Sequence, residues 1–222
     1  SFGDHLDWLV SRLLRAEPQA HERLSREAAR LKPGQTGLLA LDWWNGNRSV
    51  LVDSRLRGLL LGLSLQTSDA DIYRALLEAL ALSTRLILDT FTAAGLAVDR
   101  LSASGGISQK NPLAMQILAD ALGLPVRVPL ASQGGALGSA MLATAAAGTE
   151  NGGCDSLQEA VRRLQPQKAA VYQPNPAHAK AYATLYEEYR RLHDHFGRGE
   201  NEVMKTLLQL KKDFNFKKII QD

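Results

Sequence analysis

Apolar positions along the chain follow two spacings, and segments with the two spacings alternate. Apolar residues that recur every three to four positions predict helices at 2–15, 18–31, 70–94, 111–122, 136–147, 155–164, 176–195 and 200–212. Short apolar runs between polar turns predict strands at 37–44, 48–54, 57–63, 98–104 and 124–130. This alternation indicates a layered α/β domain with a largely parallel sheet.

Residues with capping preference support two of the helix boundaries. Ser68 or Asp69 is expected to cap the helix at 70–94. Asn111 is expected to cap the next helix, because Pro112 in a first turn loses no hydrogen bond.

The size and composition of the chain favour one domain spanning residues 1–222. Its 222 residues are 45% hydrophobic, which is enough for one sizeable core. The segment at 132–143, SQGGALGSAMLA, consists mostly of small residues. Because small residues let a helix lie close to its neighbours, we expect this segment to pack in the core and not to contact a ligand.

Charge and hydropathy exclude several kinds of partner. The 26 basic and 23 acidic residues give a net charge of +3, and the two signs are mixed along the helical segments. Such mixing is typical of solvated helix faces, so no nucleic-acid partner is expected. The chain also shows no signal-peptide pattern and no apolar run that could span a bilayer. We therefore expect a cytoplasmic protein without a membrane partner.

Cysteine and histidine residues suggest no reactive or metal site. Cys154 is the single cysteine, which fits a reducing compartment. It lies in the polar stretch NGGCDS and is expected to be an incidental thiol. His193 and His195 are two positions apart and do not share a helical face, so no metal site is predicted.

Residues 103–112, ASGGISQKNP, form the most informative motif. A predicted strand ends at Ser104, and Gly105 and Gly106 then make a corner that a ligand can approach closely, since no Cβ intervenes. The helix that Asn111 opens presents free N–H groups, which suit a phosphate or a purine. The pattern alone equally fits a tight connection without a ligand, and it lacks the glycine spacing of dinucleotide sites and phosphate loops.

The same motif carries a resemblance to a known family. Residues 103–128, together with SQGGALGSAMLA, resemble the nucleotide-binding part of the C-terminal domain of FGGY carbohydrate kinases. Within that family, residues 37–63, the start GDHLDWLV and the stretch 171–205 resemble the L-ribulokinases. The similarity extends over nearly the whole chain.

The resemblance implies an actin-like, ribonuclease-H-like ATPase fold and the binding of ATP with Mg²⁺. It also implies transfer of the γ-phosphoryl group to the 5-hydroxyl of L-ribulose, a step of L-arabinose catabolism. By position, Gly106, with Gly105 beside it, resembles the glycine that lies against the nucleotide phosphates. Asn111 resembles the asparagine that contacts adenine, and Gly3 resembles another glycine close to the nucleotide.

The stretch DWWNGNRS is a second candidate site. Aromatic and amide groups suit sugar binding, and an arginine can meet a phosphate. Trp44, Asn45 and Arg48 are therefore candidates for contacts with the substrate. The alternative is that the tryptophans pack in the core and that Asn-Gly-Asn is only a turn; at least one tryptophan, Trp43 or Trp44, is expected in the core.

Parts that the family uses for chemistry have no counterpart in this sequence. The resemblance places the catalytic aspartate in a DAH-like segment, and no DAH occurs here. The sugar-binding domain and the first strands of the C-terminal domain are also missing. We therefore expect no catalytic residue, no activity of the chain alone, and an open sheet edge that favours a homo-oligomer.

Other interpretations stay open at this point. The chain can be a non-catalytic nucleotide-binding or interaction module, or part of an FGGY kinase for another pentulose. An NAD-dependent oxidoreductase is disfavoured because the GxGxxG motif is absent.

Overall fold

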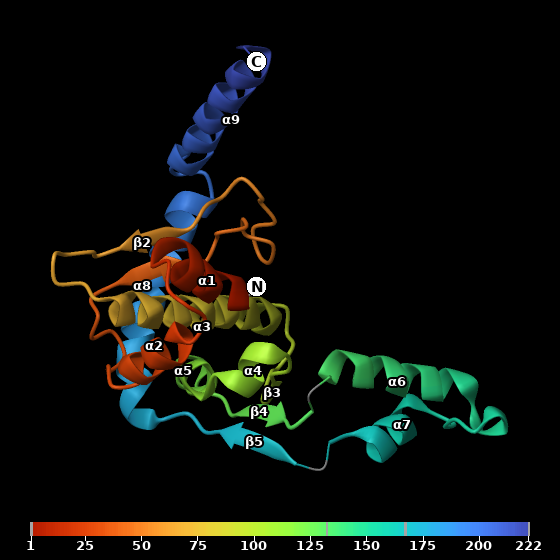
Figure 1. The fold of residues 1–222 in the computed structure, drawn as a ribbon. Coiled ribbons are helices and arrows are strands. Elements are labelled where there is room, and N and C mark those ends of the chain that lie inside the picture. The colour runs from red at the N-terminus through yellow and green to blue at the C-terminus, as the bar shows by residue number, and fades with distance from the viewer. Residues whose placement is uncertain (1, 132, 167, 222) are drawn as a thin grey trace.

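The structure, a computed structural model, describes residues 2–131, 133–166 and 168–221. Figure 1 shows a central body from which an arm, made of α6 and α7, and the C-terminal helix α9 extend in different directions. The helices are α1 Phe2–Asp7, the π-helical turn Trp8–Leu13, α2 Ala20–Ala28, α3 Asp69–Ala93, α4 Gly106–Lys110, α5 Pro112–Leu122, α6 Gly134–Ala147, α7 Leu157–Leu164, α8 Ala179–Gly197 and α9 Val203–Gln221. The strands are β1 Leu39–Leu41, β2 Leu59–Leu61, β3 Leu101–Ser102, β4 Val126–Pro129 and β5 Ala169–Tyr172.

Helix α3 is the axis of the central body. It begins with a capping box, in which Ser68 Oγ accepts from the Asp71 N–H (3.2 Å) and the Asp71 carboxylate accepts from the Ser68 N–H (2.8 Å). Every residue from Tyr73 to Leu82 is buried, because α2, α5, α8 and β1 all pack against this part of the helix. The predicted boundaries and the Ser68 cap of this helix are confirmed.

Helix α5 confirms the second predicted cap. The Asn111 side chain accepts from the Ala114 N–H at 3.0 Å, and Pro112 occupies the first turn. The helix ends at Gly123, whose φ of +66° lies in the left-handed region that favours glycine. These local signals place α5 between β3 and β4, against α3.

The described strands form two small sheets. Strand β1 pairs antiparallel with β2, and the second sheet has the order β3-β4-β5. Strand β4 runs parallel to β3 but antiparallel to β5, so this sheet is mixed and the expectation of a largely parallel sheet is wrong. Strand β5 was not predicted. The strand predicted at 48–54 is also wrong, since that segment forms bends and a single bridge between Asn47 and Asp53.

The arm overturns the expectation that residues 132–143 pack in the core. No described residue of α6 is buried, and the Leu142 side chain is 60% exposed. The reason is geometric: α7 is the main element that packs on α6, and the pair extends away from the body (Figure 1). Cys154, expected in a polar loop, is instead fully buried, and its N–H donates to the Thr144 carbonyl at 2.9 Å.

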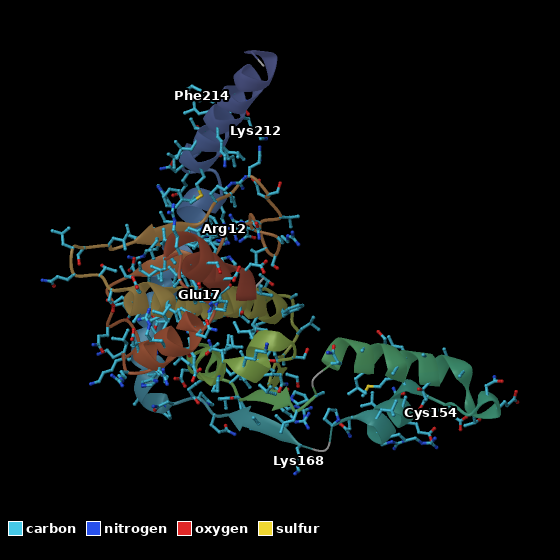
Figure 2. The ribbon with its side chains drawn as sticks, viewed as in Figure 1. Arg12, Glu17, Cys154, Lys168, Lys212 and Phe214 are labelled. Atoms are coloured by element: carbon cyan, nitrogen blue, oxygen red, sulfur yellow. The ribbon has the colours of Figure 1, made fainter. Side chains whose placement is uncertain are left out.

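Helix α9 extends from the body at the end away from β4 and β5 (Figure 1). Its buried anchor is Met204, whose sulfur accepts from the Arg57 N–H at 3.5 Å. Farther along α9, the Phe214 side chain is exposed and lies away from the body (Figure 2). Among the described helices, none is both long and apolar enough to cross a membrane.

Candidate functional site

Helix α1 stands between two cavities of the central body. Gly3, Leu6 and Asp7 line one of them, together with Gly106 and Asn111, and we call it the glycine-corner cavity. Asp4 and His5, on the other face of α1, line a second cavity that Asp42 and Tyr189 also border, and we call it the Asp42 cavity. Since successive helical residues point about 100° apart, one short helix contributes to both.

The glycine-corner cavity brings together sequence positions that lie far apart. Its volume is about 890 Å³, and its walls come from α1, α2, α3, α4 and the start of α5. Gly3, Gly106 and Asn111, which the resemblance connects with the nucleotide, all line it. Gly105 does not line it.

Gly105 shapes the corner through its backbone. Its φ of +106° and ψ of 177° belong to a region that only glycine adopts readily. Its carbonyl accepts from Ser108 Oγ at 2.8 Å, which fixes the turn into α4. Apart from its chain neighbours and the backbone of its own helix, a Cβ at Gly106 would have no described atom within 4 Å, so the space beside Gly106 is open to a ligand.

Asn111 is held by several hydrogen bonds. Besides capping α5, its Oδ1 accepts from Ser25 Oγ at 3.4 Å, and its amide donates to the Tyr73 hydroxyl at 3.2 Å. The residue is only 7% exposed. These contacts fix the orientation of the amide at the cavity wall and leave its second N–H unused within the described residues.

Sequence reasoning did not identify the wall that α2 and α3 supply. Tyr73 and Ser25 reach the cavity from these helices, and the His21 ring lies 6.2 Å from the Tyr73 ring, edge to face. Burial raises the pKa of Tyr73 to about 12, so its hydroxyl stays protonated. No local motif marks these residues, because only the packing of α2 on α3 brings them to the site.

The charges of the glycine-corner cavity are mixed. Lys110 and Arg26 contribute cations, and Asp7 and Glu22 contribute carboxylates. Within the described ranges, no three His, Cys, Asp or Glu side chains are grouped so that they could hold a metal ion. The donor set therefore does not form a closed metal site, but one or two carboxylates suffice for Mg²⁺ carried by phosphates.

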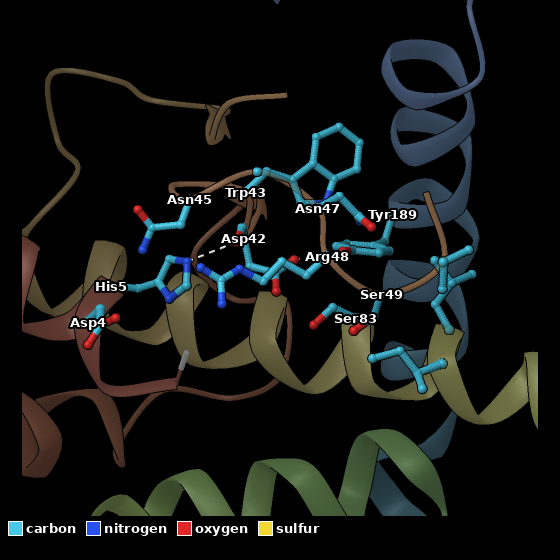
Figure 3. A pocket seen from close by; sticks show the side chains of 14 residues that line it. Asp4, His5, Asp42, Trp43, Asn45, Asn47, Arg48, Ser49, Ser83 and Tyr189 are labelled. Atoms are coloured by element: carbon cyan, nitrogen blue, oxygen red, sulfur yellow. Dashed lines mark hydrogen bonds between the residues drawn. The ribbon is translucent and has the colours of Figure 1, made fainter. Parts of the chain in front are cut away.

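The stretch DWWNGNRS contributes to the Asp42 cavity. Asn45 and Arg48 line this cavity, which has a volume of about 380 Å³, whereas Trp44 does not (Figure 3). Trp43 is 1% exposed, which confirms that one of the two tryptophans packs in the core. Trp44 packs edge-on against Trp8 (5.3 Å between ring centroids) and covers Gly58, where a Cβ would overlap its ring.

The fold is that of a carbohydrate kinase domain. Residues 1–147 match the profile of the FGGY family of carbohydrate kinases, C-terminal domain. The chain therefore belongs to this family, as its motifs predicted.

Several known proteins are similar to the chain. The ribulokinase of Halalkalibacterium halodurans is 52% identical over 191 residues, which are 86% of this chain and 34% of the relative. The ribulokinase of Shouchella clausii is 49% identical over 218 residues, which are 94% of this chain and 39% of the relative. The chain thus spans little more than a third of the length of these relatives.

Solved structures of sugar kinases confirm the fold. The xylulose kinase of Rhodospirillum rubrum has a TM-score of 0.71 and 30% identity, covering 86% of this chain and 37% of that one. The glycerol kinase of Plasmodium falciparum, solved with ADP, has a TM-score of 0.65 and 22% identity, covering 86% and 36%. The predicted α/β fold of the FGGY C-terminal domain is therefore correct.

Proposed function

We propose that this chain supplies the nucleotide-binding side of an ATP-dependent L-ribulokinase. The observation that carries the proposal is that Gly3 lines one cavity with Gly106 and Asn111, which belong to a motif far along the chain from it. The ribulokinase relatives, 52% and 49% identical to this chain, support L-ribulose as the sugar in preference to another pentulose. The intact enzyme would transfer the γ-phosphoryl group of MgATP to the 5-hydroxyl of L-ribulose.

The cavity walls suit the parts of ATP differently. Leu6 and Ile107 offer apolar contact for the flat adenine ring, and the unused Asn111 N–H can donate to it. Gly106 lets the phosphates approach the backbone, because no side chain covers it. The Lys110 ammonium group lies on the same wall and favours their negative charge.

The proposal assigns binding and not chemistry to this chain. Phosphoryl transfer needs a base for the sugar hydroxyl and a metal ion beside the phosphates. The resemblance places the base in a DAH-like segment, which has no counterpart in the sequence. Mg²⁺ would enter with the nucleotide, with Asp7 or Glu22 as protein ligands, and would neutralise phosphate charge. The isolated chain would bind MgATP without turnover.

The same proposal has consequences for the compartment and the oligomeric state of the protein. An L-ribulokinase of L-arabinose catabolism would act in the cytoplasm. A homo-oligomer is supported by two exposed features, the edge strand β3 and the apolar helix α6.

The test is isothermal titration calorimetry of MgATP into the purified chain, with MgGTP as the competitor nucleotide. Saturable binding that prefers ATP is expected. Gly106→Val should abolish most of this binding without unfolding the chain, since a Cβ at Gly106 meets no atom. Gly135→Val is the matched control, because a Cβ at Gly135 also meets no atom but lies on α6. Equal binding by the Gly106→Val variant and the wild type would refute the proposal.

A further inference from the structure

The ring of Trp44 packs against the helical segment at the start of the chain. The stretch DWWNGNRS makes this residue a candidate for a contact with the substrate, yet Trp44 lines neither the Asp42 cavity nor the glycine-corner cavity. The half-buried ring instead contacts two aromatic side chains of residues 2–13. These surroundings indicate a role other than direct contact with a ligand.

The two rings that contact Trp44 are those of His5 and Trp8. Both meet the Trp44 ring edge to face, with 5.2 Å and 5.3 Å between the ring centroids. His5 and Trp8 are three positions apart, so their side chains lie on one face of the segment. Because edge-to-face pairs have a preferred geometry, the two contacts fix the rotation of α1 about its axis as well as its position.

A hydrogen bond connects the same face of α1 to the end of β1. His5 Nε2 donates to the Asp42 carbonyl at 2.8 Å, which the dashed line in Figure 3 marks. His5 is only 3% exposed, so water competes little for this bond. Asp42 follows the buried end of β1 directly and precedes Trp44 by two residues. The segment after β1 therefore fixes α1 by a hydrogen bond and by ring contacts.

The Trp44 ring is itself fixed in position. A Cβ at Gly58, just before β2, would lie 2.4 Å from Cε3 of Trp44, so the backbone of Gly58 lies directly against the ring. The turn after Trp44 is closed by the Gly46 N–H, which donates to the Trp43 carbonyl at 3.0 Å. The ring therefore gives α1 a rigid surface to pack on.

The other face of α1 forms part of the glycine-corner cavity. Gly3, Leu6 and Asp7 line this cavity, and at 100° per residue they lie on the side of the helix opposite His5. Helix α1 has six residues, and so short a helix is not stable in water by itself. Its position therefore depends on the elements that it packs against, and a shift of α1 would move Gly3 and Asp7 at the cavity wall.

We infer that Trp44 is a positioning residue of the glycine-corner cavity, which keeps α1 where Gly3 and Asp7 form the cavity wall. Trp44 acts on the ligand through α1 and does not touch it. The inference rests on the proposed function only for the choice of MgATP as the ligand. It assigns to the nucleotide side a residue of DWWNGNRS that the sequence had suggested for the substrate.

The experiment combines hydrogen exchange with calorimetry on the full chain. Trp44→Leu removes the ring, so the amides of residues 3–13 should exchange about tenfold faster, while those of α5 keep the wild-type rate. If α1 is then in place about a tenth of the time, MgATP should bind about tenfold more weakly. Trp44→Phe retains an aromatic ring and should restore most of both properties.

The matched control is Trp43→Leu. Trp43 is the neighbouring residue and is 1% exposed, but its ring packs against His193 of α8, at 5.5 Å between the centroids. This substitution should lower the free energy of unfolding without speeding exchange in residues 3–13 more than in α5. Trp43 therefore measures what the loss of a merely structural tryptophan does.

A second variant tests the inference without removing Trp44. Gly58→Ala places a methyl group where the ring lies, so it should displace the ring and speed exchange in residues 3–13 selectively. This variant decides the question if Trp44→Leu does not fold.

Three results would overturn the inference. They are unchanged exchange of residues 3–13 in Trp44→Leu and Gly58→Ala, equal acceleration in Trp43→Leu and Trp44→Leu, and faster exchange with unchanged affinity for MgATP. If the wild type binds no MgATP and α1 is still selectively loosened, the nucleotide proposal alone is refuted and the positioning of α1 by Trp44 is confirmed.

Discussion

The side-chain amide of Asn111 donates to the hydroxyl of Tyr73 at 3.2 Å, and this hydrogen bond joins the start of α5 to the second turn of α3. Asn111 also caps α5 through Oδ1. One residue therefore stabilises a helix end, ties two helices together and borders the glycine-corner cavity. Its contributions to folding and to binding can be separated by two substitutions.

Asn111→Ala is expected to lower the free energy of unfolding by about 1–2 kcal/mol, because α5 loses its cap and Tyr73 loses its partner. Asn111→Asp should cost less than half as much, since aspartate caps helices as well as asparagine does. Urea denaturation followed by circular dichroism measures the free energy of unfolding of both variants.

Asn111→Asp should nevertheless weaken MgATP binding more than Trp43→Phe, which changes the other cavity. Equal losses of MgATP affinity in the two variants would mean that an effect on stability was mistaken for an effect on binding.

The buried ion pair of α3 predicts a large loss of stability. Arg74 Nε donates to Glu78 Oε1 at 2.8 Å, with both side chains at most 4% exposed, and Arg74 also donates to the Tyr182 hydroxyl at 3.1 Å. Arg74→Met leaves a buried carboxylate without its cation and should cost about 3–5 kcal/mol in chemical denaturation.

The control for this prediction is the pair Arg23–Glu27 on α2. It has the same spacing along the helix, but its side chains are 48% and 42% exposed. Arg23→Met should cost no more than about 0.5 kcal/mol, because water screens an exposed pair. Similar losses of unfolding free energy in the two variants would contradict the conclusion that the buried ion pair of Arg74 stabilises the fold.

The stability of the chain should fall in mild acid because of His193. This residue is fully buried, donates from Nδ1 to Asp194 at 2.9 Å, and has no partner for Nε2 among the described residues. Burial lowers the pKa of His193 below 6.5. Below that pH the unfolded chain takes up the proton more readily than the folded chain, so the free energy of unfolding decreases as pH falls.

His193→Phe removes this titration and keeps a ring between Trp43 and Tyr189. Denaturation between about pH 7 and about pH 5 should show a smaller loss for the variant than for the wild type. Parallel pH profiles of the two proteins would show that His193 does not cause the acid sensitivity.

The exposed arm should drive self-association. Leu142 on α6 is 60% exposed, on a helix without a buried residue among those described. Leu142→Ser should therefore shift sedimentation equilibrium towards the monomer. Leu65→Ser is the control, since Leu65 is fully exposed in the loop before α3; a monomeric wild type, or the same shift in both variants, would refute a role of the arm.

Sequence reasoning succeeded where the signal was local. Ser68 and Asn111 were recognised because capping depends on residues within one turn. Strand β5 was missed because it is four residues long and its partner β4 lies far away in the sequence. The burial of α6 was predicted wrongly. Small apolar residues show that a helix can pack closely against another element, but they do not show that such an element is present.

At the candidate site, too, the residues of a local motif were predicted and those brought together by packing were missed. Gly106 and Asn111 belong to one short motif and were found together, whereas Tyr73 and His21 reach the cavity only through the packing of α2 on α3. Asp42 was missed as the centre of the second cavity, because its importance comes from contacts with Tyr189 and His5, which lie at opposite ends of the chain.

Helix α1 has only six residues, yet each of its two faces is a wall of a different cavity. Such a short rigid element cannot shift one face and leave the other in place. A ligand that displaces α1 on one side therefore alters the affinity of the opposite side. Thermodynamic linkage makes this influence mutual, so a ligand that favoured binding in the opposite cavity would itself be bound more tightly, by the same factor, when that cavity is filled.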